Sequence, residues 1–112
     1  MYIPRKDLFP GALEMMVLQT LQLQPMHGYA LAQRIRQISR ELLAIEEGSL
    51  YPALQRMLKE RWVEAEWSVS STGRRVRVYH ITQAGKAHLE REVSSFERML
   101  EGIRMVLQQE AI

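Results

Sequence analysis

The chain has 112 residues, 46% of them hydrophobic, which is enough for a single domain with a core of its own and excludes a disordered chain. It contains no cysteine, which excludes disulfides and thiolate metal sites and predicts a cytoplasmic protein. The net charge is only +2, but residues 1–88 carry twelve Lys and Arg against eight Asp and Glu, a net +4, whereas residues 89–112 carry three against five, a net −2.

Neither a membrane partner nor a secreted location is expected. No apolar run approaches the roughly 18 residues that a membrane span needs. The segment from Met1 to Phe9 has no apolar stretch behind its basic residues and does not resemble a secretory signal. The basic surplus therefore lies in the part of the chain that would have to contact phosphate.

Two helices are predicted in the first third of the chain. Apolar residues recur at helical spacing from about Phe9 to Gln24, with Pro10 in the first turn and Pro25 after the end. His27-Gly28 begins a second helix, which a polar break at Ser39 to Glu41 ends.

A third, amphipathic helix is predicted from Gly48 to Lys59. Leu50, Leu54 and Met57 share one side of it. The other side carries residue types that a DNA groove accepts, with Ser49 and Tyr51 on the flanks: Gly48, Pro52, Gln55, Arg56 and Lys59. An ordinary surface helix also has a polar outer side, so this pattern alone does not distinguish a DNA-binding helix from a surface helix without a partner.

After Trp62 the period changes from helical to alternating. Val63, Ala65, Trp67 and Val69 alternate with polar residues and predict a half-buried strand. Ser70 to Gly73 has turn chemistry. The antiparallel partner strand is predicted to place Val76 and Val78 on one face and Arg75, Arg77 and Tyr79 on the other. The pair forms a hairpin with a basic tip.

The order of these elements predicts a mostly α fold with a small β-hairpin. Three helices followed by a hairpin is the order of a winged helix-turn-helix, in which the third helix enters the major groove of DNA and the hairpin lies beside it. We expect residues 1–82 to form this DNA-binding domain and residues 83–112 to form a C-terminal dimerisation helix, within one structural unit.

The candidate DNA surface combines base-reading and phosphate-binding residue types. Gln55 can bond an adenine edge and Arg56 can fork onto guanine, while Ser49 and Tyr51 can bond phosphate or base. Arg74, Arg75 and Arg77 place three guanidinium groups at the hairpin, where they suit phosphate clamping. The alternative is that these arginines are ordinary solvent-exposed charges on a turn. The polar face of the neighbouring helix favours DNA binding over this alternative.

The last helix is predicted to follow Thr82 as N-cap and to carry a narrow apolar seam. The seam residues recur at spacings of four, three, four, three and four: Leu89, Val93, Phe96, Leu100, Ile103 and Leu107. Such a seam favours pairing between two chains, because a free seam would expose a large apolar patch. The alternative is that it packs on the first helix of its own chain.

Three segments resemble the PadR-like transcriptional regulators, in particular the short subgroup with a single C-terminal helix. They are residues 25–31, residues 46–54 and residues 74–85. The resemblance implies a winged helix, dimerisation through the last helix and repression at a palindromic operator. It also implies DNA contacts from Ser49, Tyr51 and Pro52 and from the wing at Arg74 and Arg75.

The resemblance also bears on ligands. Some relatives bind aromatic or drug-like effectors near the dimer helices, where a large aromatic residue occupies the position of Phe96. Stacking on a small aromatic effector is one role for this ring, and a core aromatic of the seam is the role that we favour. No cofactor and no metal are expected, because the three histidines lack ligand spacing and Ser49 lacks a nucleophile-elbow context.

The sequence disfavours two other classes of function. An enzyme is disfavoured by the same absence of catalytic spacing, and a winged helix that binds only protein would carry a neutral or acidic wing. The sequence therefore predicts a homodimeric, sequence-specific repressor that binds double-stranded DNA at an inverted repeat and is relieved by a small-molecule effector if it has one.

Overall fold

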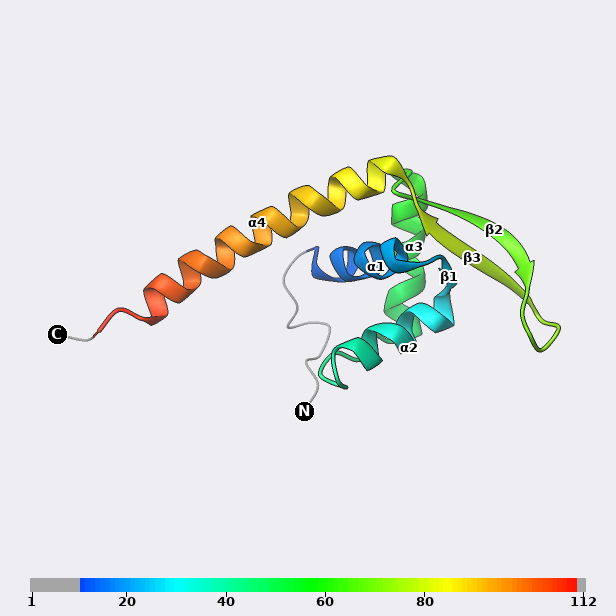
Figure 1. The fold of residues 1–112 in the computed structure, drawn as a ribbon, viewed down its shortest axis with the longest axis horizontal. Coiled ribbons are helices and arrows are strands. Elements are labelled where there is room, and N and C mark those ends of the chain that lie inside the picture. Colours follow the sequence, from blue (N-terminus) through cyan, green and yellow to red (C-terminus); the bar gives the residue numbers. More distant parts are fainter. Residues whose placement is uncertain (1–10, 111–112) are drawn as a thin grey trace.

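The structure is a computed structural model that describes residues 11–110 as four helices and a small antiparallel sheet (Figure 1). The elements in chain order are α1 (Ala12–Leu23), β1 (Met26–His27), α2 (Gly28–Ile38), α3 (Glu47–Lys59), β2 (Val63–Val69), β3 (Arg75–Ile81) and α4 (Gln83–Leu107). This is a winged helix with a long C-terminal helix, as the sequence predicts. We call the β2–β3 hairpin the wing.

The predicted helix boundaries hold closely where the structure describes them. The first helix begins at Ala12 and ends at Leu23, before the extended Gln24, and the predicted start at Phe9 and Pro10 lies outside the described residues. The His27 side chain caps α2 by accepting a hydrogen bond from the Ala30 amide at 3.3 Å. α3 begins one residue earlier than predicted, at Glu47.

The core lies where α1, α2 and α3 meet the sheet. Its fully buried side chains come from all of these helices and from β2: Val17, Leu18, Leu31, Leu50, Leu54, Met57 and Val63. Each such aliphatic side chain contributes about 1.5–3 kcal/mol by leaving water. The inner face of α3 is thereby fixed, so its outer face has one orientation relative to the rest of the domain.

The sheet has a third strand that the sequence did not reveal. β1 pairs with β3 on the side opposite to β2, so the strand order is β1-β3-β2 and β3 is central. Met26 lies opposite Tyr79 in this register, and Ala65 lies opposite Tyr79 on the other side. Flanked on both sides, Tyr79 is buried.

The faces of β3 follow the predicted alternation, with Val76 and Val78 on one face. The opposite face contacts the core, because Tyr79 is buried and both valines are only partly buried. Arg75 and Arg77 share the face of Tyr79, because alternate residues of a strand point the same way. On β2, only the first half of the predicted apolar face is covered: Val63 is buried, and Trp67 and Val69 are exposed.

The wing and α4 extend in opposite directions from the helical body (Figure 1). Thr82 caps α4 as predicted, since its hydroxyl oxygen accepts the Gly85 amide at 3.0 Å. α4 has 25 residues, so it is about 38 Å long, and the described chain is 64 Å in its longest dimension. Its Leu89 belongs to the core cluster of the described residues, and Val93 packs against that cluster.

Candidate nucleic-acid interface

The exposed face of α3 carries the predicted polar residues. Pro52, Gln55 and Lys59 are exposed, whereas Ala53 and Leu54 are buried on the opposite side. Because α3 begins at Glu47, Pro52 lies in its second turn and not in its first, where a missing amide hydrogen would cost nothing. The residue whose carbonyl loses a helical partner, Gly48, is exposed, so water can satisfy that oxygen.

Arg56 is placed differently from the sequence-based prediction. The sequence suggests a free guanidinium, but its Nη2 donates to Oε1 of Glu14 on α1 at 2.5 Å. Arg56 lies with Lys59 and Trp62 along a separate hollow, on the flank of α3 that faces α1 and α4. A contact between Arg56 and a base would therefore require this ion pair to open.

Tyr51 lies on the other flank of α3, packed on the first residue of α2. A Cβ added to Gly28 would lie 2.9 Å from Cε1 of Tyr51 and 3.1 Å from its hydroxyl oxygen. A larger residue at position 28 would therefore displace the Tyr51 ring. Gly28 is a positioning residue that the sequence reasoning missed, and its only signal was its place at the start of a predicted helix.

The wing presents cations over an aromatic ring. The guanidinium carbon of Arg75 lies 4.4 Å from the ring centroid of Trp67, and that of Arg77 lies 5.8 Å from it. Such cation–π contacts contribute about 0.5–1 kcal/mol at exposed sites. Burial raises the pKa of Tyr79 above its ordinary value, partly offset by the charge of Arg77, so this phenol is neutral at physiological pH.

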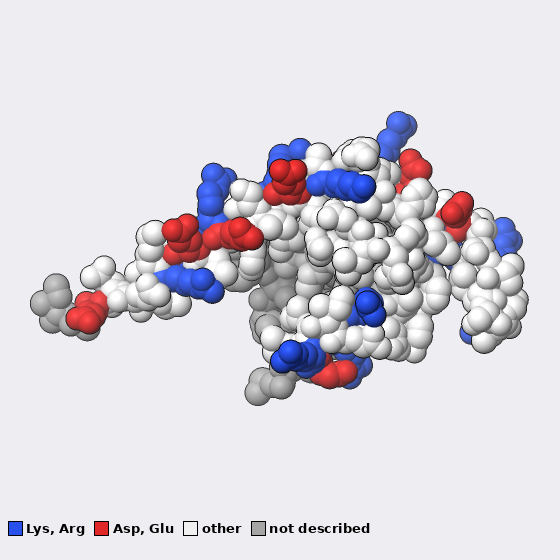
Figure 2. Space-filling model, in the orientation of Figure 1, with Lys and Arg blue, Asp and Glu red and all other residues white. Residues whose placement is uncertain are grey.

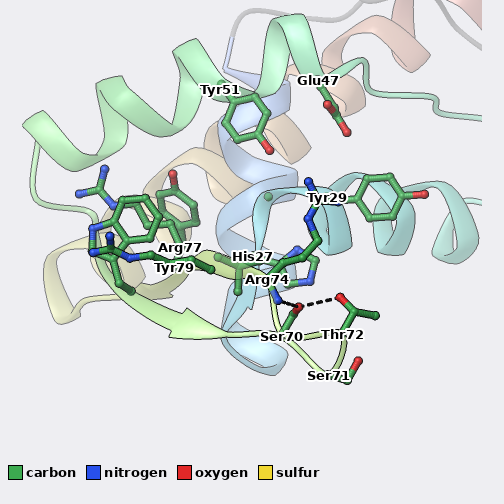
Figure 3. Close-up of a pocket in the computed structure, with 14 residues that line it drawn as sticks. His27, Tyr29, Glu47, Tyr51, Ser70, Ser71, Thr72, Arg74, Arg77 and Tyr79 are labelled. Carbon is green, nitrogen blue, oxygen red and sulfur yellow. Dashed lines mark hydrogen bonds between the residues drawn. The ribbon is translucent and has the colours of Figure 1, made fainter.

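The turn at the end of the wing is held by its own backbone and hydroxyl groups. The Arg74 amide donates to Oγ of Ser70 at 3.1 Å, and the hydroxyls of Ser70 and Thr72 lie 3.0 Å apart (Figure 3). Gly73 has a φ of +82°, which favours glycine. Arg74 therefore starts from a defined backbone position beside the tip.

A cleft of about 790 Å³ separates the wing from α3 and the start of α2. In Figure 3, Tyr51 and Glu47 project from α3 on one side, and Arg77 and Tyr79 belong to the sheet on the other. Of the predicted DNA-binding residues, the cleft is lined by Tyr51, Arg74, Arg75 and Arg77. Gln55 and Lys59 lie outside it on the exposed face of α3, and Ser49 is half-buried.

The predicted seam on α4 divides into two parts. Leu89 is buried in the chain's own core and Val93 packs against that core, so the prediction that both are available to a second chain needs correction. Phe96 and Leu100 are half-buried, and Ile103 and Leu107 are exposed. Figure 2 shows Lys and Arg interspersed with Asp and Glu along α4.

Two searches of the described residues bear on other functions. Within residues 11–110, no group of three or more His, Asp or Glu side chains is placed to hold a metal ion. None of the described helices is long and apolar enough to cross a membrane.

Comparison with known proteins agrees with this architecture. The sequence model of the transcriptional regulator PadR-like family matches residues 17–91. Uncharacterized protein X of Lysinibacillus sphaericus is 29% identical over 104 residues, covering 93% of this chain and 95% of that protein. The crystal structure of a PadR-like transcriptional regulator from Bacillus cereus is 32% identical with a TM-score of 0.76, covering 90% of this chain and 96% of that one. A PadR family transcriptional regulator from Eggerthella lenta is 25% identical with a TM-score of 0.79, covering 90% and 86%.

Proposed function

The chain belongs to the PadR-like family of transcriptional regulators, and on that premise we propose that it is a homodimeric repressor that occupies an inverted-repeat operator. One observation carries the proposal: the exposed polar face of α3 lies beside a wing whose arginines line the same cleft as Tyr51. A recognition helix with adjacent phosphate-binding groups is the arrangement by which a winged helix engages the major groove. The protein would act in the cytoplasm, on double-stranded DNA.

The proposed contacts fall into two groups. Arg74, Arg75 and Arg77 bind phosphate from the wing and fix the orientation of the protein. The residues of α3 face the groove: Ser49, Tyr51, Pro52, Gln55 and Lys59. Arg56 joins the second group once DNA displaces Glu14 from its guanidinium, an exchange of a carboxylate for the two acceptors on a guanine edge.

Dimerisation is proposed through the part of α4 that extends beyond the body. The proposed seam consists of Phe96, Leu100, Ile103 and Leu107, of which the last two are exposed, Leu107 to 76%. Apolar residues at heptad spacing pair with a like surface, and two-fold pairing presents two α3 helices to two half-sites. Each chain then contributes one half of the readout.

In our proposal, the main role of Phe96 is to pack in this seam as a core aromatic residue. A small aromatic effector that stacks on Phe96 would change the distance or angle between the two chains and thereby release the operator. No cofactor takes part in the proposed function, and no enzymatic activity is assigned to the chain.

Substitutions on the wing and on α3 should distinguish residues that bind phosphate from residues that recognise bases. Arg75→Ala is expected to weaken binding to all duplexes by a similar factor and to reduce the salt dependence by about one phosphate contact. Gln55→Ala or Arg56→Ala is expected to change the order of preference among sequences, at a cost of about 1–3 kcal/mol for a lost base contact. Fluorescence-anisotropy titrations of several duplexes at several salt concentrations measure both quantities. If Arg75→Ala, Gln55→Ala and Arg56→Ala each weaken binding to every duplex by a similar factor, the assignment of separate phosphate-binding and base-reading residues is wrong.

A further inference from the structure

The exposed indole of Trp67 has no place in the core. It is 58% exposed, although its strand neighbour Val63 is buried. What it contacts instead is the pair of guanidinium groups already described, with Arg75 at 4.4 Å and Arg77 at 5.8 Å from the ring centroid. The ring is therefore an exposed aromatic surface of the wing that contacts two of its cations.

The register of the sheet explains this contact. Trp67 lies directly opposite Arg77, and Arg75 lies opposite Val69, one diagonal step away. All three side chains point to the same face, and long or aromatic side chains reach both direct and diagonal neighbours across antiparallel strands. The strand pairing alone thus places one ring within reach of both arginines.

Within residues 11–110, no carboxylate neutralises the two cations. Among the residues that the structure describes, neither Arg75 nor Arg77 forms an ion pair. Glu64 and Glu66 of β2 alternate with Ala65 and Trp67 and so point to the other face of the sheet. Glu47 lines the same cleft from α3 without lying within ion-pair distance of either arginine.

An aromatic ring and a carboxylate bind a guanidinium group in different ways. Stacking uses the flat face of the cation and leaves its in-plane N–H groups directed outward, whereas a carboxylate would occupy those donors and cancel the charge. The Nε of Arg77 is an exception, because it is buried with no hydrogen-bond partner among the described residues, so a phosphate would be bound by the terminal Nη groups of this side chain.

We propose that Trp67 is a positioning residue for DNA binding, which holds Arg75 and Arg77 by cation–π contacts with its ring so that both present their terminal N–H groups to phosphate. This inference rests on the proposed function. Fixing two flexible side chains before binding lowers the conformational entropy lost when they meet the phosphate backbone.

The test is a double-mutant cycle with a random-sequence DNA duplex, because phosphate clamping does not depend on sequence. Trp67→Leu is expected to weaken binding about two- to fivefold, as loss of one exposed cation–π contact, that of the nearer Arg75, would. Trp67→Phe, the matched control that keeps an aromatic face, retains most of the affinity. In a background of Arg75→Ala and Arg77→Ala, Trp67→Leu is expected to have no further effect. The helical circular dichroism of each variant reports that the fold is intact.

Two outcomes overturn the inference alone. If Trp67→Leu leaves the affinity unchanged, the ring does not position the arginines; if its loss persists in the double-arginine background, the ring contacts DNA directly. A wild-type protein that fails to bind any duplex at low salt would overturn the proposed function and this inference together, which distinguishes the two failures.

Discussion

Gly85→Ala is expected to destabilise the protein by roughly 3 kcal/mol, the upper range for forcing an extra carbon into a packed site. A Cβ at this position would lie 2.1 Å from the backbone oxygen of Trp62 and 2.8 Å from Cγ1 of Ile81. The first of these atoms cannot rotate away, because that carbonyl accepts the Thr82 amide at 3.0 Å. The substitution would have to move either the start of α4 or the end of α3.

The control lies on the same helix. A Cβ added to Gly102 has no atom within 4 Å, so Gly102→Ala is expected to be neutral or to stabilise the helix by up to about 1 kcal/mol. Urea denaturation followed by circular dichroism measures both changes. If Gly85→Ala costs as little as Gly102→Ala, the close approach of α4 to Trp62 is not a constraint on the fold.

This close approach also matters for function. Gly85 lies where α4 leaves the wing, next to the stacked rings of Trp62 and His88, whose centroids are 3.6 Å apart. These contacts at the start of α4 therefore set the direction in which the helix extends from the body. In the proposed dimer, that direction determines the distance between the two α3 helices, and hence the spacing of half-sites that the protein can occupy.

Leu100→Glu is expected to convert the protein to monomers and to weaken binding to an inverted repeat about 100-fold or more, because the avidity of two linked half-sites is lost. Leu100 is half-buried and does not belong to the buried core cluster of the described residues, so a carboxylate there should leave the monomer folded while charging the seam. Sedimentation velocity measures the oligomeric state, and a DNA titration measures the affinity.

The matched control places the same carboxylate outside the seam. Arg98 is exposed and lies on the opposite side of α4 from Phe96 and Leu100, so Arg98→Glu is expected to remain dimeric. A Leu100→Glu protein that stays dimeric and binds the repeat normally would place the dimer interface elsewhere.

Local patterns predicted most of the fold. The helical spacing of Leu50, Leu54 and Met57 predicted α3 and its buried face, and the change of period after Trp62 predicted the wing. These signals depend on neighbours within one or two turns or strands, which a single sequence displays directly.

What the sequence did not reveal depends on distant partners. β1 has only two residues, too few to show a period, and its pairing with β3 places Tyr79 in the central strand, where it is buried. The ion pair between Glu14 and Arg56 joins residues 42 positions apart, which no local spacing indicates. Likewise, nothing in the sequence distinguishes Gly28 and Gly85, which accept close neighbours, from the unconstrained Gly102.

The candidate site was therefore predicted in its residue types more than in its geometry. The arginines of the wing and the polar face of α3 followed from composition and spacing. The cleft that joins Tyr51 to Arg77, and the stack of Arg75 on Trp67, required the three-dimensional register.

Selection of bound duplexes from a random DNA pool, followed by titration of the enriched sequence at increasing salt, tests the central proposal most directly. We expect an inverted repeat to be enriched, with the logarithm of its association constant falling linearly with the logarithm of the salt concentration, by about 0.9 for each phosphate neutralised. A pool that enriches no inverted repeat, together with an affinity that does not respond to salt, would contradict the assignment of this chain as a dimeric, sequence-specific repressor.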